Sequence, residues 1–331
     1  MRKSKFIHCI DSHTAGEPTR LVIDGLPVIK GNNLKQKTKY FSNKLDNYRS
    51  ILTGEPRGHA PMHAAIYIPS NSKKSDFGLI LMSALGYLDM CGHALIGSIT
   101  SLINSKKLSF KNSKNLIKIE TCAGIITVTT NWNKKNIKSI SFVNQKSFSI
   151  KEDFIINIPE YGKFTVNFAY GGLWYIIVNS KEIGIKIEKK NLNKLIIAGK
   201  KIRMKINSRI DKIKSKIQLP EKFPQTLFFD EINSKYGRNF VTSDELGFDR
   251  SPCGTGCCAR LALMYSQGKI KEKQNYIQKS IIDTSFNTRI VKVSKNGNIL
   301  PEITGSAYIT GINKIYLDPN DTIKNGFFLY S

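Results

Sequence analysis

Two short stretches of this chain share one pattern, in which a cysteine is followed by a glycine, a small or polar residue and an apolar run of helical length. The first stretch begins at Cys91 and the second at Cys253. The run after Cys91 is apolar on nearly every side, which is typical of a helix buried at the centre of a domain. Two such helices in 331 residues favour two similar halves, each built around one of them.

The segments around these helices are mostly strand-like, with apolar or alternating patterns. Strands are predicted at 7–10, 21–23, 64–68, 77–82, 116–120, 124–130, 139–143, 162–169, 173–178, 240–242, 289–294 and 306–317. Helices are predicted at 45–52, 92–105, 254–266 and over most of 189–217. We predict a polar loop at 11–20 and a hairpin turn at Asp24-Gly25.

The order of strands, cysteine loop, buried helix and further strands occurs twice. It predicts an α+β fold of two halves, each with a curved sheet around a central helix. We expect one half at 1–145, carrying Cys91 and joined by the C-terminal segment 310–331, and the other at 146–309, carrying Cys253. The active site is expected between the halves.

The composition limits the classes of partner. A formal net charge of +26 invites a nucleic-acid interpretation, but the basic residues are spread along the whole chain from Lys3 to Lys324, without an RNA-binding aromatic motif or a helix-turn-helix signature. We therefore expect no nucleic-acid partner. No apolar run approaches the ~18 residues of a membrane span, and the N-terminus lacks the features of a signal peptide. A cytoplasmic protein without a membrane partner is expected, and a homodimer is left open.

The six cysteines are too few and too scattered for a disulfide framework, so thiols in a reducing compartment are expected. Cys91-x-His93 and the spacing of Cys253, Cys257 and Cys258 match no standard zinc pattern, so no metal site is expected. A lone buried cysteine is most often a small apolar residue. That interpretation holds for Cys257 and Cys258, and the matched Cys-Gly pairs argue against it at the two helix starts.

The helix starts suggest a specific chemistry. Unpaired N–H groups and the positive end of the helix dipole favour a thiolate there and also bind a carboxylate. Two such cysteines on opposite sides of one carbon would remove a proton from one face and add one to the other. The alternative is a non-catalytic module that binds a small carboxylate with the same helix starts.

Several stretches, taken together, resemble the proline racemase family, which works without pyridoxal phosphate. They are DSHTAGEPTR (11–20), EPRGH (55–59), MCGH (90–93), YGG (170–172), DRSPCGTG (249–256) and ITGSAY (303–308). The resemblance implies the diaminopimelate-epimerase-like fold with two pseudo-symmetric halves, and no cofactor. It implies Cys91 and Cys253 as the proton-transfer residues. It also places five residues at the substrate: Gly92, His93, Asp249, Gly254 and Thr255.

Three activities compete within that family. Dehydratases of trans-3-hydroxyproline lack one of the two cysteines, and both are present here. The stretches GYL (86–88), GLWY (172–175) and RNFV (238–241) look more like 4-hydroxyproline 2-epimerases, whereas 303–311 and the N-terminal stretch look equally like proline racemase. We expect epimerisation of trans-4-hydroxy-L-proline to cis-4-hydroxy-D-proline, with racemisation of proline as the alternative.

The chain also departs from the family pattern at three places. Pro61-Met62-His63 stands where an acidic or polar residue and an aromatic or small apolar residue are more usual. Cys257-Cys258 replaces Thr-Ser, and Ala94 replaces Gly or Asn. If His63 lines the substrate pocket, it would hydrogen-bond a ring hydroxyl or reduce the space for it.

Overall fold

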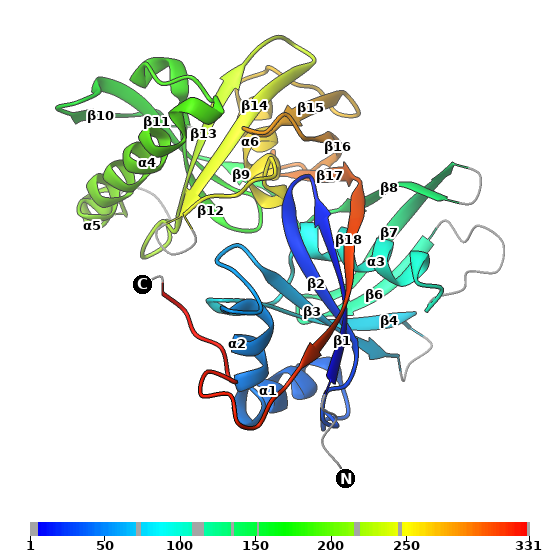
Figure 1. The fold of residues 1–331 in the computed structure, drawn as a ribbon. Helices are drawn as coiled ribbons and strands as arrows, with labels where there is room; N and C mark the ends of the chain where they lie inside the picture. Colours follow the sequence, from blue (N-terminus) through cyan, green and yellow to red (C-terminus); the bar gives the residue numbers. More distant parts are fainter. Residues whose placement is uncertain are drawn as a thin grey trace. The chain divides into compact units, whose positions relative to one another are not determined.

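The computed structural model describes residues 6–70, 74–107, 116–133, 136–150, 152–214, 219–243 and 247–329 (Figure 1). The chain divides into two units. One comprises Met1–Phe142 and Gly305–Ser331, and the other comprises Val143–Thr304. Each unit combines strands with a central helix that begins directly after one of the two cysteines discussed above.

The first unit is organised around the helix α3 (Gly92–Asn104). Its other elements are β1 (Phe6–Thr14), β2 (Glu17–Asp24), α1 (Leu34–Lys44), α2 (Asn47–Thr53), β3 (His63–Pro69), β4 (Phe77–Ser83), β5 (Gly86–Leu88), β6 (Leu116–Thr121), β7 (Gly124–Asn133), β8 (Asn136–Val143) and β18 (Ala307–Tyr316). β1 pairs antiparallel with both β2 and β18, and β3 continues the sheet parallel to β2 and antiparallel to β4.

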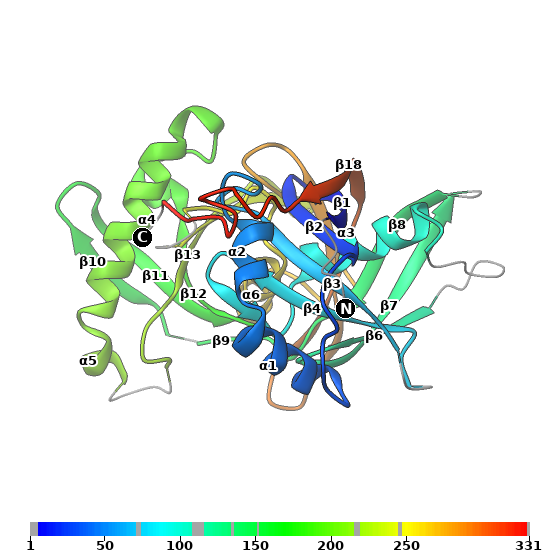
Figure 2. The same ribbon diagram turned by 60° about the horizontal axis from the view of Figure 1, so that its bottom comes forward.

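Helix α3 packs against β1, β2 and β18 (Figure 2). All residues from Ala94 to Leu102 are buried, as expected for a helix that is apolar on nearly every side. Gly97 lets the backbone come close, because a Cβ there would lie 2.9 Å from Ser12 Oγ on β1. The tight packing fixes the start of α3, and therefore Cys91, relative to the N-terminal hairpin.

The second unit is organised around α6 (Gly254–Ser266). Its other elements are β9 (Phe148–Ser149), β10 (Phe154–Ile158), β11 (Gly162–Tyr170), β12 (Trp174–Asn179), the 3₁₀ turns η1 (Ser180–Ile183) and η2 (Lys189–Asn191), α4 (Leu192–Asn207), α5 (Ile210–Lys214), β13 (Gln225–Glu231), β14 (Tyr236–Ser243), β15 (Asn275–Lys279), β16 (Ser285–Val293) and β17 (Ile299–Gly305). β10, β11 and β12 form an antiparallel set, and β13 joins it parallel to β12.

The side chains of strand β12 alternate between the two faces of this sheet. Ile176 and Val178 pack in one apolar cluster with residues of α4, whereas Tyr175 and Ile177 pack in another with residues of α6. Successive side chains of a strand point to opposite faces, so a strand covered by a helix on each side has to be apolar along its whole length. The alternation also points Tyr175 toward the start of α6.

The two helices after the cysteines are confirmed almost to the residue, and the fold is the α+β fold predicted from the sequence. The prediction of a loop at 11–20 is wrong. Most of these residues extend β1 and β2, which are joined by a tight turn at Ala15-Gly16, where φ is 52° and 99°. Asp24-Gly25 is not a hairpin turn, because β2 pairs in parallel with the next strand, β3.

Seven elements were not predicted from the sequence: α1, β5, β9, β10, β13, β15 and β17. Residues 215–217, at the end of a predicted helical region, lie outside the described residues. Among the helices that the structure describes, none has both the length and the apolar character needed to cross a lipid bilayer.

Candidate active site

Cys91 stands at the start of α3 in extended backbone conformation, with φ of −143°. Its carbonyl oxygen accepts the first helical hydrogen bond, from the N–H of Leu95 at 2.9 Å. The next residue, Gly92, is held close to Phe142, since a Cβ at Gly92 would lie 2.9 Å from that ring. The Cys91 side chain is partly buried, so it remains accessible to a small molecule.

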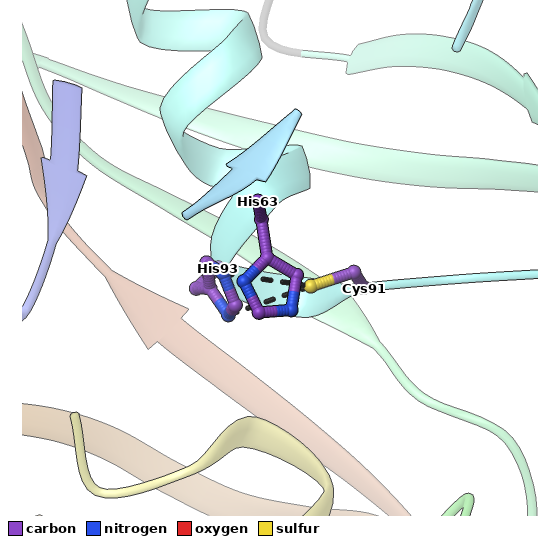
Figure 3. A group of neighbouring side chains, drawn as sticks. All are labelled: His63, Cys91 and His93. Carbon is purple, nitrogen blue, oxygen red and sulfur yellow. Dashed lines mark hydrogen bonds between the residues drawn. The ribbon is translucent and has the colours of Figure 1, made fainter. Parts of the chain in front are cut away.

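Two imidazole rings lie beside the Cys91 sulfur (Figure 3). His93, in the first turn of α3, places Nδ1 at 3.4 Å and Nε2 at 3.7 Å from Sγ. His63, at the start of β3, lies edge-on to His93, with ring centroids 4.4 Å apart and an interplanar angle of 86°. The hydroxyl of Thr14 donates a hydrogen bond of 2.8 Å to the carbonyl of His93 and ties this turn to β1.

Both imidazoles are neutral at physiological pH. Burial lowers the pKa of His93 well below its usual value, and the neighbouring His63 adds to that effect. Burial also lowers the pKa of His63, although its hydrogen bond to the Pro61 carbonyl acts in the opposite direction. A neutral ring can donate an N–H to a thiolate or accept a proton from a thiol, so His93 can assist either form of Cys91.

Cys253 has a different setting at the start of α6. Its φ is +65°, a left-handed conformation that costs a residue with a Cβ about 1–2 kcal/mol. Its carbonyl accepts from the N–H of Cys257 at 2.7 Å, and its own N–H donates to Ser251 Oγ at 3.0 Å. Only 7 % of the residue is exposed. The strained conformation presents the sulfur to groups that come from the sheet.

Two hydroxyl groups surround the Cys253 sulfur. The hydroxyl oxygen of Tyr175, from β12, lies 3.3 Å from Sγ and 2.6 Å from Thr255 Oγ1. Thr255 Oγ1 is 3.8 Å from the same sulfur. Thr255 was anticipated from the sequence, whereas Tyr175 was not, because a tyrosine in an apolar strand is indistinguishable from a core residue.

The pKa of the Cys253 thiol is raised above its usual value, chiefly by burial and then by the negative charge of Asp249. The Tyr175 hydroxyl, the Gly256 N–H and the Thr255 hydroxyl oppose this increase without cancelling it. The sequence pattern favours a thiolate at a helix start, whereas burial acts in the opposite direction at Cys253 and favours its protonated form.

Two further predicted residues, Asp249 and Gly254, lie near Cys253, as does Gly256. Asp249 closes the turn after β14, where its Oδ1 accepts from the N–H of Ser251 at 2.7 Å. A Cβ at Gly254 would lie no nearer than 3.6 Å to Ile303 Cδ1, so this position is open. At Gly256 a Cβ would lie 3.2 Å from the Cys253 sulfur, so a larger residue there would press on the thiol.

The cysteines after Gly256 are structural. Cys257 and Cys258 are fully buried, and their sulfurs accept contacts from the side-chain amides of Asn239 at 3.6 Å and Asn144 at 3.3 Å. All six cysteines lie within the described residues, and each carries a thiol. Among the predicted site residues, the structure brings Cys91, Gly92 and His93 together in the first unit. It brings Asp249, Cys253, Gly254 and Thr255 together in the second.

These features define a class: an α+β chain with two buried helices, each starting at a thiol beside groups that donate or accept protons. The proline racemase family model matches residues 9–328, so this chain belongs to the proline racemase family. The proline racemase of Acetoanaerobium sticklandii is 38% identical over 338 residues, which cover 99% of each chain. The family and its relatives identify the chain as an isomerase, a racemase or epimerase.

Two further relatives extend the comparison. The trans-3-hydroxy-L-proline dehydratase of Bacillus thuringiensis subsp. konkukian is 34% identical over 335 residues, covering 99% of this chain and 100% of its own. The crystal structure of a hydroxyproline epimerase from Agrobacterium vitis, with bound trans-4-hydroxy-L-proline, has a TM-score of 0.83 at 26% identity and covers 99% of this chain and 97% of its own. The diaminopimelate-epimerase-like fold expected from the resemblance is confirmed.

Proposed function

We propose that this chain inverts the α-carbon of a cyclic amino acid without a cofactor, by proton transfer through Cys91 and Cys253. One sulfur, as thiolate, takes the α-proton from one face of the substrate ring. The other, as thiol, donates a proton to the opposite face. The substrate's bonds are otherwise unchanged, and the two sulfurs exchange their protonation states in each turnover. The observation that carries the proposal is the thiol at the start of each buried helix.

The environment of Cys253 supports a direction for the first step. Burial keeps this residue protonated, so Cys253 starts as the proton donor and Cys91 as the base. The N–H of His93, 3.4 Å from the Cys91 sulfur, would stabilise the thiolate form. The N–H groups at the two helix starts would bind the substrate carboxylate and stabilise the charge that develops when the α-proton leaves.

The preferred substrate in this proposal is trans-4-hydroxy-L-proline, with cis-4-hydroxy-D-proline as the product. The stretches GYL (86–88), GLWY (172–175) and RNFV (238–241) support it, as does the fold similarity to a hydroxyproline epimerase that holds this ligand. The presence of both cysteines argues against the dehydration performed by the Bacillus relative. Proline is the second candidate, because a relative at 38% identity is a proline racemase. Thiol chemistry of this kind fits a reducing compartment such as the cytoplasm.

The test is a direct comparison of two substrates in deuterated water. The purified chain is incubated with L-proline and with trans-4-hydroxy-L-proline. The products are separated by chiral chromatography, and their deuterium content is determined by mass spectrometry. We expect cis-4-hydroxy-D-proline to form faster than D-proline, with one solvent deuterium at the α-carbon. Faster formation of D-proline would favour the second candidate. Binding of either compound without inversion or deuterium uptake would leave only a carboxylate-binding module and would refute the proposal.

A further inference from the structure

We propose that His63, Cys91 and His93 form a binding site for a thiophilic divalent cation, with Zn²⁺ as the first candidate, and that its occupation reversibly blocks isomerisation. All three residues belong to the first unit, and each offers one ligand atom. The inhibition rests on the function proposed above, because it requires Cys91 to be a reacting group. The binding of the cation does not depend on that function.

The distances fit a small tetrahedral cation. The three ligand atoms lie within 4.8 Å of one another. With zinc–ligand bonds of about 2.0–2.3 Å, two ligands of one tetrahedral zinc lie roughly 3.6 Å apart. The Cys91 sulfur already lies 3.4 Å and 3.7 Å from the two ring nitrogens of His93. One of these two nitrogens would be the ligand, and any separation that now approaches 4.8 Å would have to shorten by about 1 Å around a bound zinc.

The hydrogen bonding of His63 prepares it as a ligand. Its Nδ1 lies 3.0 Å from the carbonyl oxygen of Pro61. A carbonyl oxygen can only accept, so Nδ1 carries the proton and Nε2 keeps its lone pair. Histidines that bind metals generally donate their other N–H to a carbonyl or carboxylate in this way, which fixes both the tautomer and the ring orientation. Figure 3 shows the rings of His63 and His93 grouped with the Cys91 sulfur, and its dashed lines join that sulfur to His93.

The ligand set selects the kind of cation. A thiolate and two neutral imidazoles favour zinc and its softer neighbours over magnesium or calcium, which prefer oxygen ligands. Three protein ligands leave a fourth position for water or for an oxygen of a small carboxylate. A bound cation would occupy the sulfur lone pair that removes the α-proton, so we infer an inhibitory site and not a resident cofactor.

The sequence prediction of no metal site rested on two spacings that match no zinc pattern, that of Cys91 with His93 and that of Cys253 with Cys257 and Cys258. The third ligand of the proposed site, His63, comes from β3. Its place beside Cys91 could be inferred only once β3 and the start of α3 were known to meet. His63 is also one of the positions at which this chain departs from its family pattern.

The binding experiment uses metal-free protein and no substrate. Zn²⁺ affinity is measured by calorimetry, and Co²⁺ is used as a spectroscopic probe whose thiolate-to-metal charge-transfer band reports a bound sulfur. The variants are His63→Phe, which keeps a ring against His93 but removes both nitrogens, and Cys91→Ser. Cys122→Ser is the matched control, because this partly buried thiol of the same unit bonds to Thr38 instead.

We expect the wild type and Cys122→Ser to bind Zn²⁺ equally. His63→Phe should weaken binding about tenfold or more, and Cys91→Ser should lose the charge-transfer band. Unchanged affinity in His63→Phe, or a persisting band in Cys91→Ser, would overturn the site. Thermal unfolding of each variant checks that the fold is retained.

A separate assay tests the inhibition. Zn²⁺ should suppress isomerisation by the wild type, a chelator should restore it, and His63→Phe should need about tenfold more Zn²⁺ for the same effect. If Zn²⁺ binds through Cys91 and isomerisation continues, the role proposed for Cys91 fails while the metal site stands. If Zn²⁺ does not bind, the metal site fails whatever the isomerase activity.

Discussion

The two cysteines that begin α3 and α6 share a sequence pattern but not an environment. Cys91 is partly buried, lies in extended conformation and is next to two neutral imidazoles. Cys253 is 7 % exposed, has a φ of +65° and is next to two hydroxyl groups. The helix start is common to both, so it cannot be what makes them differ. Burial raises the pKa of Cys253, and the side chains that the strands bring to the two helix starts also differ.

This difference suits a reaction in which one sulfur donates a proton and the other accepts one. Two thiols with different pKa values favour the state in which one carries a proton and the other does not, and the transfer needs one of each. Burial of Cys253 favours the thiol there, whereas the imidazole N–H beside Cys91 can stabilise a thiolate. The asymmetry of the two units is therefore a functional property of the proposed site.

The largest expected effect comes from removing either sulfur. Cys91→Ser and Cys253→Ser should each lower the rate of inversion about a thousandfold or more, because a serine hydroxyl is a far weaker acid and base than a thiol near neutral pH. The rate is measured by chiral chromatography, and circular dichroism checks the fold. Cys258→Ser is the control, since it makes the same substitution at a buried thiol that contacts Asn144 and has no role in the proposed transfer. Full activity in either catalytic variant would end the two-cysteine proposal.

A smaller effect is expected at the residue that sequence analysis missed. Tyr175→Phe removes the hydroxyl that lies 3.3 Å from the Cys253 sulfur. In the wild type this hydroxyl lowers the pKa of the thiol, so the pKa should rise in the variant. The thiol should then give its proton less readily, and kcat/KM should fall about tenfold. It should fall equally in both directions, because an enzyme does not change the equilibrium between two epimers. Tyr161→Phe, in the turn before β11, is the control for loss of a tyrosine hydroxyl in the same unit.

The outcome at Tyr175 distinguishes a positioning role from a structural one. A merely structural residue would change the stability of the unit without moving the pH dependence of Cys253. The pH dependence of Cys253 is measured as the rate of its alkylation by iodoacetamide at increasing pH. If Tyr175→Phe leaves both this profile and the activity as in the wild type, the hydroxyl does not act on the sulfur.

The sequence predicted the two central helices well because their apolar residues surround the whole helix, a pattern that no exposed helix shares. Helix α1 was missed for the opposite reason, since only Leu34 and Phe41 of its residues are buried and the rest is mostly lysine and polar. The strand residues at 11–20 look polar because β1 and β2 bury charged groups in pairs. Arg20, for example, is held by Asp11 at 2.8 Å, and such pairing is invisible before the register is known.

The same limit applies to the candidate site. His93 and Thr255 could be predicted because they follow their cysteines directly along the chain. Tyr175 and His63 reach the two sulfurs from strands far away in sequence, and only the packing of sheet on helix brings them there. Burial of Cys253, which opposes the thiolate that a helix start favours, depends on the same long-range packing. A local pattern reports the helix dipole, but burial is set by the whole unit.

The smallest expected effect concerns the charge beside Cys253. Asp249→Asn removes the negative charge that raises the pKa of this thiol and leaves the oxygen that accepts from Ser251. The pKa should fall, so at a mildly alkaline pH a larger fraction of Cys253 is thiolate. Its alkylation by iodoacetamide should therefore be roughly a few-fold faster. The rate is followed by mass spectrometry of the peptide that contains Cys253.

The wild-type profile is as informative as the variant. Because burial is the largest cause of the raised pKa, alkylation of wild-type Cys253 should still increase with pH where an exposed cysteine has already reached its plateau. Asp249→Asn should move the profile toward that of an exposed cysteine without reaching it, since burial remains. A wild-type plateau at or below the usual cysteine pKa would mean that the helix start outweighs burial after all. The two sulfurs would then be alike, and the proposed starting state, with Cys253 as donor and Cys91 as base, would lose its physical basis.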